Sequence, residues 1–210
     1  YLPMDLVKCY PAQPLNLNID ASGNVDTLSL QVCDITMPLI IDVRTTGTLH
    51  NVADSVALGA DLRTDVTTMN LSCINRYLGL TDVHFPKMVL HADTRLRQAS
   101  QISMDALLLE GKGRAHLVGS IDLKSMVYQA KARITDLQLH DFLPQDSLYL
   151  LTAQAKLSGS GTDFLSRKTR LQAQLDIDHL GYASWMLDSI HADCRLKDGK
   201  AMAEMSSRSE

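Results

Sequence analysis

Aromatic residues are scarce in this sequence. They make up 5% of its 210 residues, and a single Trp is present. Long apolar runs are missing as well, because the richest stretches are 39–41 and 107–109. A transmembrane helix needs about 18 or more consecutive apolar residues. The sequence therefore predicts no membrane-spanning helix within these residues, and aliphatic side chains must line its interior.

Charge of one sign is not concentrated anywhere in the chain. The formal net charge is −4 at pH 7. Chains that bind nucleic acids or anionic membranes usually carry dense clusters of Lys and Arg. We therefore expect no nucleic-acid partner. The four cysteines, Cys9, Cys33, Cys73 and Cys194, form no C-x-x-C pair and are unequally spaced. We interpret them as free thiols that act as small hydrophobic residues.

Signatures of catalysis are also missing. There is no G-x-S-x-G motif, and the G-K-G of residues 111–113 lacks the spacing of a phosphate-binding loop. The seven histidines are scattered, and no two of them share the spacing of a metal-binding pair. The many aspartates in strand-like segments occupy polar positions, where a solvated surface explains them. We expect no enzyme activity, no cofactor and no metal site.

The two ends of the sequence suggest that it belongs to something longer. It begins at Tyr1 without a basic segment followed by an apolar core, so no signal peptide is recognisable. The last residues, 206–210, do not resemble the end of a finished domain. We expect a piece of a longer polypeptide whose targeting signals lie outside it.

Apolar and polar residues alternate along almost the whole chain. Leu15, Leu17 and Ile19 alternate with Asn16 and Asn18, and similar runs recur to the end. Such a pattern is typical of strands with one apolar face. Between the runs lie turn signals at residues 22–24, 46–47, 110–113, 158–161 and 198–200. The sequence predicts an all-β fold: an antiparallel meander of about a dozen strands with a right-handed twist.

Two segments interrupt this alternation. Residues 70–79 have the capping residue, spacing and terminal glycine of a short helix, and its apolar face is formed by Leu71, Ile74, Tyr77 and Leu78. Such a helix is expected to cap one end of the apolar interior; an ordinary core-closing turn is the alternative. The second interruption is 137–144. We interpret the whole chain, 1–210, as one continuous segment with degenerate repeats at roughly 1–86 and 87–210.

A sheet with one apolar face must fold over, form a sandwich or cover a ligand. We predict a concave, apolar groove. Its expected lining residues are Leu17, Ile19, Leu30, Ile41, Val43, Leu58, Leu62, Val66, Leu90, Leu96, Leu117, Ile121, Ile134, Leu151, Leu157, Leu175 and Ile177. The opposite face is expected to carry cross-strand charge pairs that involve Arg63, Arg95, Arg97, Lys131, Arg133 and Lys156.

Several strand and turn segments of this sequence resemble repeats of the TamB family, the envelope proteins of the translocation and assembly module within the AsmA-like group. The resembling segments are 14–23, 46–51 with 58–62, and 139–144 with 153–164. The third pair is the most similar. The four cysteines and the segment 70–79 have no counterpart in that pattern.

The resemblance implies a long curved β-sheet, shaped like a half-pipe or a folded taco, with an apolar concave interior and one or two short helices. It also implies the periplasmic portion of a protein anchored in the inner membrane of a Gram-negative bacterium. Functions of this family are phospholipid transport between the two membranes and assembly of outer-membrane proteins. The implied partners are an acyl-chain ligand and an outer-membrane barrel of the TamA or BamA type.

Two other functions fit the residues. A β-augmentation scaffold would offer a sheet edge to an unfolded outer-membrane β-barrel protein. A structural β-sandwich of a surface protein would use the apolar face as an ordinary closed core. An open trough favours lipid shelter, an exposed edge strand favours the scaffold, and a filled interior favours the sandwich.

Overall fold

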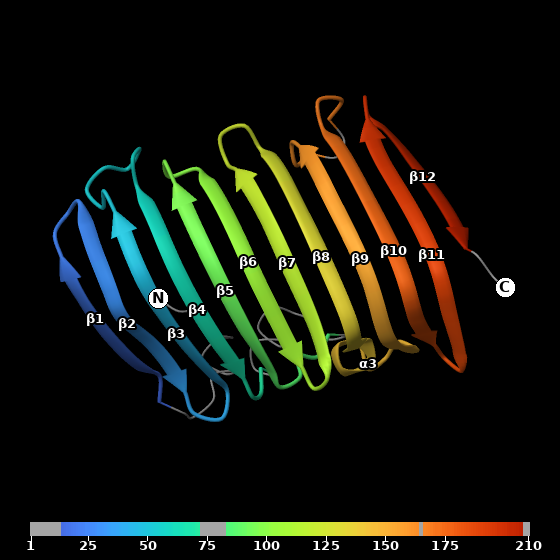
Figure 1. Ribbon diagram of the computed structural model, residues 1–210, viewed down its shortest axis with the longest axis horizontal. Helices are drawn as coiled ribbons and strands as arrows, with labels where there is room; N and C mark the ends of the chain where they lie inside the picture. Colours follow the sequence, from blue (N-terminus) through green and yellow to red (C-terminus); the bar gives the residue numbers. More distant parts are fainter. Residues whose placement is uncertain (1–13, 72–82, 164–165, 208–210) are drawn as a thin grey trace, which may run out of the picture.

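Twelve antiparallel strands form one open sheet, and their order in the sheet is their order in the chain (Figure 1). The computed structural model describes residues 14–71, 83–163 and 166–207. The strands are β1 (Asn16–Gly23), β2 (Thr27–Met37), β3 (Ile41–His50), β4 (Gly59–Thr68), β5 (Met88–Arg97), β6 (Gln101–Glu110), β7 (Gly113–Asp122), β8 (Val127–Gln138), β9 (Leu148–Ser160), β10 (Arg170–Tyr182), β11 (Trp185–Lys197) and β12 (Lys200–Ser207). The predicted all-β class and the long antiparallel sheet are confirmed.

Most turn signals lie where hairpins turn. Asn24 follows β1, and its side-chain Oδ1 accepts hydrogen bonds from the backbone N–H groups of Asp26 and Thr27. Gly111 and Gly199 both have positive φ and lie in the β6–β7 and β11–β12 turns. These are positions where glycine avoids the steric cost that other residues carry.

Two predicted turns differ from the structure. The turn predicted at 158–161 is displaced, because β9 continues to Ser160 and Gly159 pairs with strands on both sides. The turn predicted at residues 46–47 is wrong. Gly47 lies inside β3 with a φ of 149°, opposite Leu30 of β2 and Leu62 of β4. A Cβ at this position would lie 2.0 Å from the carbonyl oxygen of Asp61. The β2–β3 register shifts beside it, between Leu30 and Cys33. Glycine is therefore needed here for a close approach of neighbouring backbones in a strand, not for a reversal of the chain.

The two interruptions of the alternation join β4 to β5 and β8 to β9. The second contains α3 (Leu139–Phe142). Most of the predicted helix 70–79, including Ile74, Tyr77 and Leu78, lies outside the described residues. Leu71 is described, and it is buried, with 8% of its surface exposed. The connections follow every fourth strand, so they divide the sheet into β1–β4, β5–β8 and β9–β12.

The described end of the first connection, residues 83–87, meets the second connection at one rim of the sheet. The backbone N–H of His84 donates to the carbonyl oxygen of Phe142 at 2.7 Å. Its ring Nδ1 lies 2.9 Å from the carbonyl oxygen of Asp141. Because a carbonyl oxygen can only accept, this contact requires the Nδ1-protonated ring. The segments that break the strand pattern thus contact each other across the ends of the strands between them.

Replacing Gly47 with Ala should destabilise the chain by more than the same replacement at Gly111. At Gly111 nothing lies within 4 Å of the added Cβ, so only the left-handed backbone is penalised, by about 1 kcal/mol. At Gly47 the strands must also separate, and we expect a loss of about 3 kcal/mol or more. Urea denaturation of both variants measures this difference. Equal losses would show that the close approach at Gly47 carries no strain.

Candidate functional site

The apolar residues of the sheet form continuous rows across the strands. Because cross-strand partners in an antiparallel pair point to the same face, the strand registers define which residues are neighbours. One row, in which all but two side chains are large, consists of Leu17, Ile35, Val43, Val66, Leu90, Leu108, Ala115, Ile134, Ala153, Ile177 and Ile190. A second row, nearer the other ends of the strands, consists of Leu28, Leu49, Ala60, Leu96, Ile102, Ile121, Tyr128, Gly159, Leu171 and Leu196.

Smaller residues predominate between these two rows. The small members are Gly47, Thr64, Ala92, Thr94, Ala106, Gly119, Ala130, Ala132, Ala155, Ala173 and Ala192. Larger residues such as Leu62, Leu117 and Leu157 occur among them. Small side chains are therefore more frequent in the middle of the face than in the two outer rows. The sequence-based list missed these small residues, although the same alternation places them on this face.

No second layer covers this face within the part of the chain that the structure describes. The molecule exposes 14162 Å² of surface, whereas a compact monomer of this size exposes about 9,700 Å². Among the described residues, the buried hydrophobic side chains are few: Ile40, Ala60, Leu71, Ala106, Leu137, Ala153 and Leu196. A closed sandwich would bury whole rows, so this arrangement counts against the closed-core alternative.

The predicted lining residues share this face. Leu58 lies immediately before β4, and the others take register positions on the apolar side of the strands. None of them is buried. Leu17, Ile19, Leu157 and Leu175 are exposed, and the rest are half-buried. The two described cysteines, Cys33 and Cys194, are free, half-buried thiols in the middle rows of the same face.

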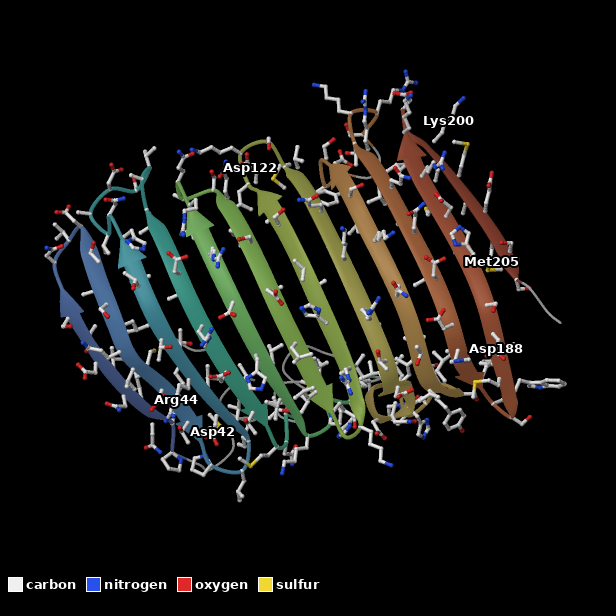
Figure 2. All side chains as sticks on the ribbon, viewed as in Figure 1. Asp42, Arg44, Asp122, Asp188, Lys200 and Met205 are labelled. Atoms are coloured by element: carbon white, nitrogen blue, oxygen red, sulfur yellow. The ribbon has the colours of Figure 1, made fainter. Side chains whose placement is uncertain are left out.

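The opposite face is polar, and most of its charges are paired across strands (Figure 2). Arg44 binds Asp34 at 2.9 Å, and Arg63 binds Asp93 at 3.0 Å. Arg97 donates two hydrogen bonds to Asp61, which hold the pKa of that carboxyl below its usual value. Arg95 lies 3.7 Å from Asp61. The predicted charge pairing is therefore confirmed for Arg63, Arg95 and Arg97.

Five histidines are hydrogen-bonded to aspartates on this polar face. The pairs are His50–Asp61, His91–Asp65, His116–Asp105, His179–Asp188 and His191–Asp176, at 2.5–3.2 Å. The hydrogen bond that the His179 ring donates to the Asp188 carboxylate raises the pKa of His179. Within the described residues, no three His, Cys, Asp or Glu side chains gather as a metal site. The histidines therefore act as hydrogen-bonding partners of single carboxylates.

One carboxyl group lies on the apolar side. Glu110, the last residue of β6, has the parity of Leu108 and is buried, with 7% of its surface exposed. Its Oε2 has no hydrogen-bond partner among the described residues. Burial raises the pKa of Glu110, and the nearby Asp141 carboxylate of α3 raises it further, while the backbone N–H of Gln138 opposes the shift. The second connection thus packs against this rim of the apolar face through a pair of acidic side chains.

Comparison of the chain with protein-family models, with curated proteins and with solved structures found no match. Within the described residues, no helix combines the length and hydrophobicity that crossing a bilayer requires. The geometry of the two sheet faces is therefore the basis for a functional proposal.

Replacing Glu110 with Gln should raise stability at neutral pH. A carboxyl whose pKa is raised by folding binds more protons in the folded state, so stability falls as pH rises from the unfolded pKa to the folded pKa. Gln removes this loss. At pH 7 the free energy of unfolding of the variant should exceed that of the native chain. This difference in free energy should become smaller towards pH 4.5, the ordinary pKa of a Glu side chain.

Urea denaturation at pH 4.5 and pH 7 measures the effect. The matched control is Glu204→Gln, which removes the same charge from an exposed position on β12. The control should be unchanged at both pH values. A pH-independent difference for Glu110→Gln would contradict the raised pKa.

Proposed function

We propose that this chain is a periplasmic segment of a TamB-like protein that shelters lipid acyl chains during phospholipid transport between the inner and outer membranes. It also supports outer-membrane protein assembly through the full-length protein. The observation that carries the proposal is the apolar face itself. It crosses every strand of the sheet without interruption, and no other layer covers it in the described residues.

Desolvation is the physical reason that such a face suits an acyl chain. Each CH₂ group exposed to water costs about 0.8 kcal/mol. A lipid tail that leaves a bilayer loses its contacts with the other acyl chains. It then incurs that cost along its whole length unless another apolar surface covers it. A surface that continues from strand to strand removes the cost at each step, so no single position becomes a barrier.

The dimensions of the sheet agree with this role. The strands have 8 to 13 residues, which corresponds to about 26–43 Å. The hydrocarbon core of a bilayer is about 30 Å thick, so acyl chains fit within the width of the face. The smaller residues between the two large rows favour a path along the strand order, from β1 towards β12. The periplasmic location, the membrane anchor and the barrel partner rest on the family resemblance.

A charge on the apolar face should block lipid binding. Ile134→Asp places a carboxylate on the apolar side of β8, where an acyl chain cannot solvate it. Thr135→Asp, one residue later, places the same charge on the polar side next to Arg114. We expect lipid recovered with the purified chain, measured by mass spectrometry, to fall at least about tenfold for Ile134→Asp, since burying an unpaired charge costs several kcal/mol.

The Thr135→Asp control should retain the native amount of lipid. Circular dichroism must first show that both variants keep the strand content of the native chain. A folded Ile134→Asp variant that retains native lipid would contradict the acyl-chain proposal. A native chain that carries no lipid, and binds none from phospholipid vesicles, would contradict it as well.

The edge strands favour a second function, the β-augmentation scaffold. All eight residues of β1 and all eight of β12 are exposed, and one side of each strand has no partner in the described sheet. An extended segment of an unfolded β-barrel protein can pair with such an edge. If this is the function, Ala203→Pro in β12 should abolish binding of an unfolded barrel protein, measured by fluorescence anisotropy. Ile134→Asp should then have no effect on that binding.

A further inference from the structure

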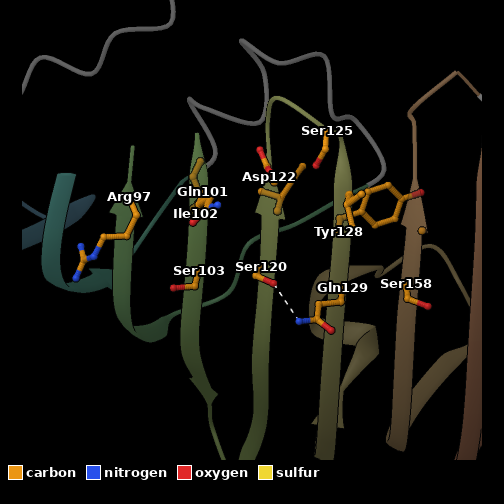
Figure 3. Close-up of a pocket in the computed structure, with 13 residues that line it drawn as sticks. Arg97, Gln101, Ile102, Ser103, Ser120, Asp122, Ser125, Tyr128, Gln129 and Ser158 are labelled. Atoms are coloured by element: carbon orange, nitrogen blue, oxygen red, sulfur yellow. Dashed lines mark hydrogen bonds between the residues drawn. The ribbon is translucent and has the colours of Figure 1, made fainter. Parts of the chain in front are cut away.

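The polar face contains a trough over β6–β10 that the acyl-chain proposal does not use. Two adjoining hollows, of about 680 and 600 Å³, share Ser103, Ser120, Gln129 and Ser158. These four residues are register neighbours on successive strands (Figure 3). The shared lining joins the two hollows into one trough.

The floor of the trough is low because the side chains on it are small. Ser103, Ser120 and Ser158 have small side chains, and the hollow reaches past them to Gly119 and Ala130, whose side-chain positions belong to the apolar face. Gln129 Nε2 donates to Ser120 Oγ at 3.3 Å. Hydroxyl and amide groups both donate and accept hydrogen bonds. Such a lining suits a ligand that carries many hydroxyl groups.

Two lysines face each other at one end of the trough. Lys131 of β8 and Lys156 of β9 are direct register partners and line the same hollow. Like charges directly opposite each other destabilise a sheet. Among the described residues, neither lysine has an ion-pair partner. Arg133, two residues further along β8, has none there either. The charge pairing predicted for these three residues is therefore absent from the described part of the sheet.

The carboxylates nearest to the lysine pair in the same row already have partners. On one side, Val118 separates Lys131 from Asp105, which binds His116 at 2.6 Å. On the other side, Gln174 separates Lys156 from Asp193, which accepts hydrogen bonds from Gln174 and Arg195. The lysine pair is thus left as an uncompensated positive end of a polar trough.

We propose that this trough binds an anionic glycan, that is, a hydroxylated sugar chain carrying carboxylate, phosphate or sulfate groups. The anionic group lies between Lys131 and Lys156 and relieves their mutual repulsion. The sugar hydroxyls pair with the serine and glutamine side chains. Val118, 44% exposed beside Lys131, provides an apolar contact for the C–H face of a ring. The five strands span about 19 Å, which is long enough for a few sugar units.

The serine, glutamine and lysine side chains of this site lie on the face opposite to the proposed lipid surface, so the two proposals are tested independently. The first hollow also touches Ile102, Ile121, Tyr128 and Gly159 of the second apolar row, and the glycan proposal does not depend on them. Lipid recovery reports on one face, and glycan binding reports on the other. Because the strands alternate their side chains, a substitution at Lys131 does not alter the apolar rows.

Isothermal titration calorimetry with a sulfated dextran oligosaccharide, at about physiological ionic strength, tests the proposal. The variant Lys131→Gln/Lys156→Gln should weaken binding by about tenfold, as expected for the loss of two exposed ion pairs. The matched control is Lys197→Gln/Lys200→Gln. It removes another pair of facing lysines, at the β11–β12 turn, outside the trough. The control should bind like the native chain.

Ser120→Leu tests the shape of the trough without changing its charge, because the larger side chain fills the floor and both lysines stay in place. We expect this variant to lose the oligosaccharide as well. Equal weakening by the Lys197→Gln/Lys200→Gln control would show non-specific attraction and overturn the proposal. Undiminished binding by Ser120→Leu would overturn the glycan assignment. Polyaspartate binding as tight as that of the oligosaccharide would do the same, since it would point to an acidic polypeptide partner.

Discussion

Backbone hydrogen bonding between strands that are neighbours in the sequence holds this molecule together. Each strand pairs with its neighbours in the sequence, and the edge strands β1 and β12 have one partner each in the described sheet. Few of the described side chains are buried. Each hairpin therefore depends mainly on the adjacent hairpins, as in other repeat-built proteins. A fold of this kind can lengthen by adding strands without rearranging those already present. It cannot easily tolerate a strand that pairs out of register.

Register matters because a shift of one residue moves every side chain to the other face. Local irregularities in strand pairing return the apolar side chains to the same face where the alternation is interrupted. One lies in β2 between Leu30 and Cys33, where the pairing shifts with both β1 and β3, and another lies in β8 between Ile134 and Leu137. Val32, within the first irregularity, is paired with Asp20 and lies on the polar side. These irregularities let the rows of apolar residues continue across strands whose simple alternation is interrupted.

Alternation also gives the sheet two surfaces of different chemistry. The apolar surface is continuous and uncovered in the described residues, and the polar surface is a network of Asp pairs with Arg and His. Within the described ranges, neither surface gathers three His, Cys, Asp or Glu side chains as a metal site. A function that fits both is binding over an extended area, in which many weak contacts replace a few strong ones. Shape therefore matters more than any single residue.

The sequence alone determined the strands, the antiparallel meander and the identity of the apolar face, because period-two alternation is a local property of the backbone. Leu62 and Ile134 could be assigned to that face from their immediate neighbours. Only the tertiary structure decided that Gly47 belongs inside a strand, that Glu110 is buried against Asp141, that His84 joins the two connections, and that Lys131 faces Lys156. Each of these depends on which residue of another strand or connection lies opposite. Registers, bulges and packing between distant segments set that partner, and a local pattern does not encode it.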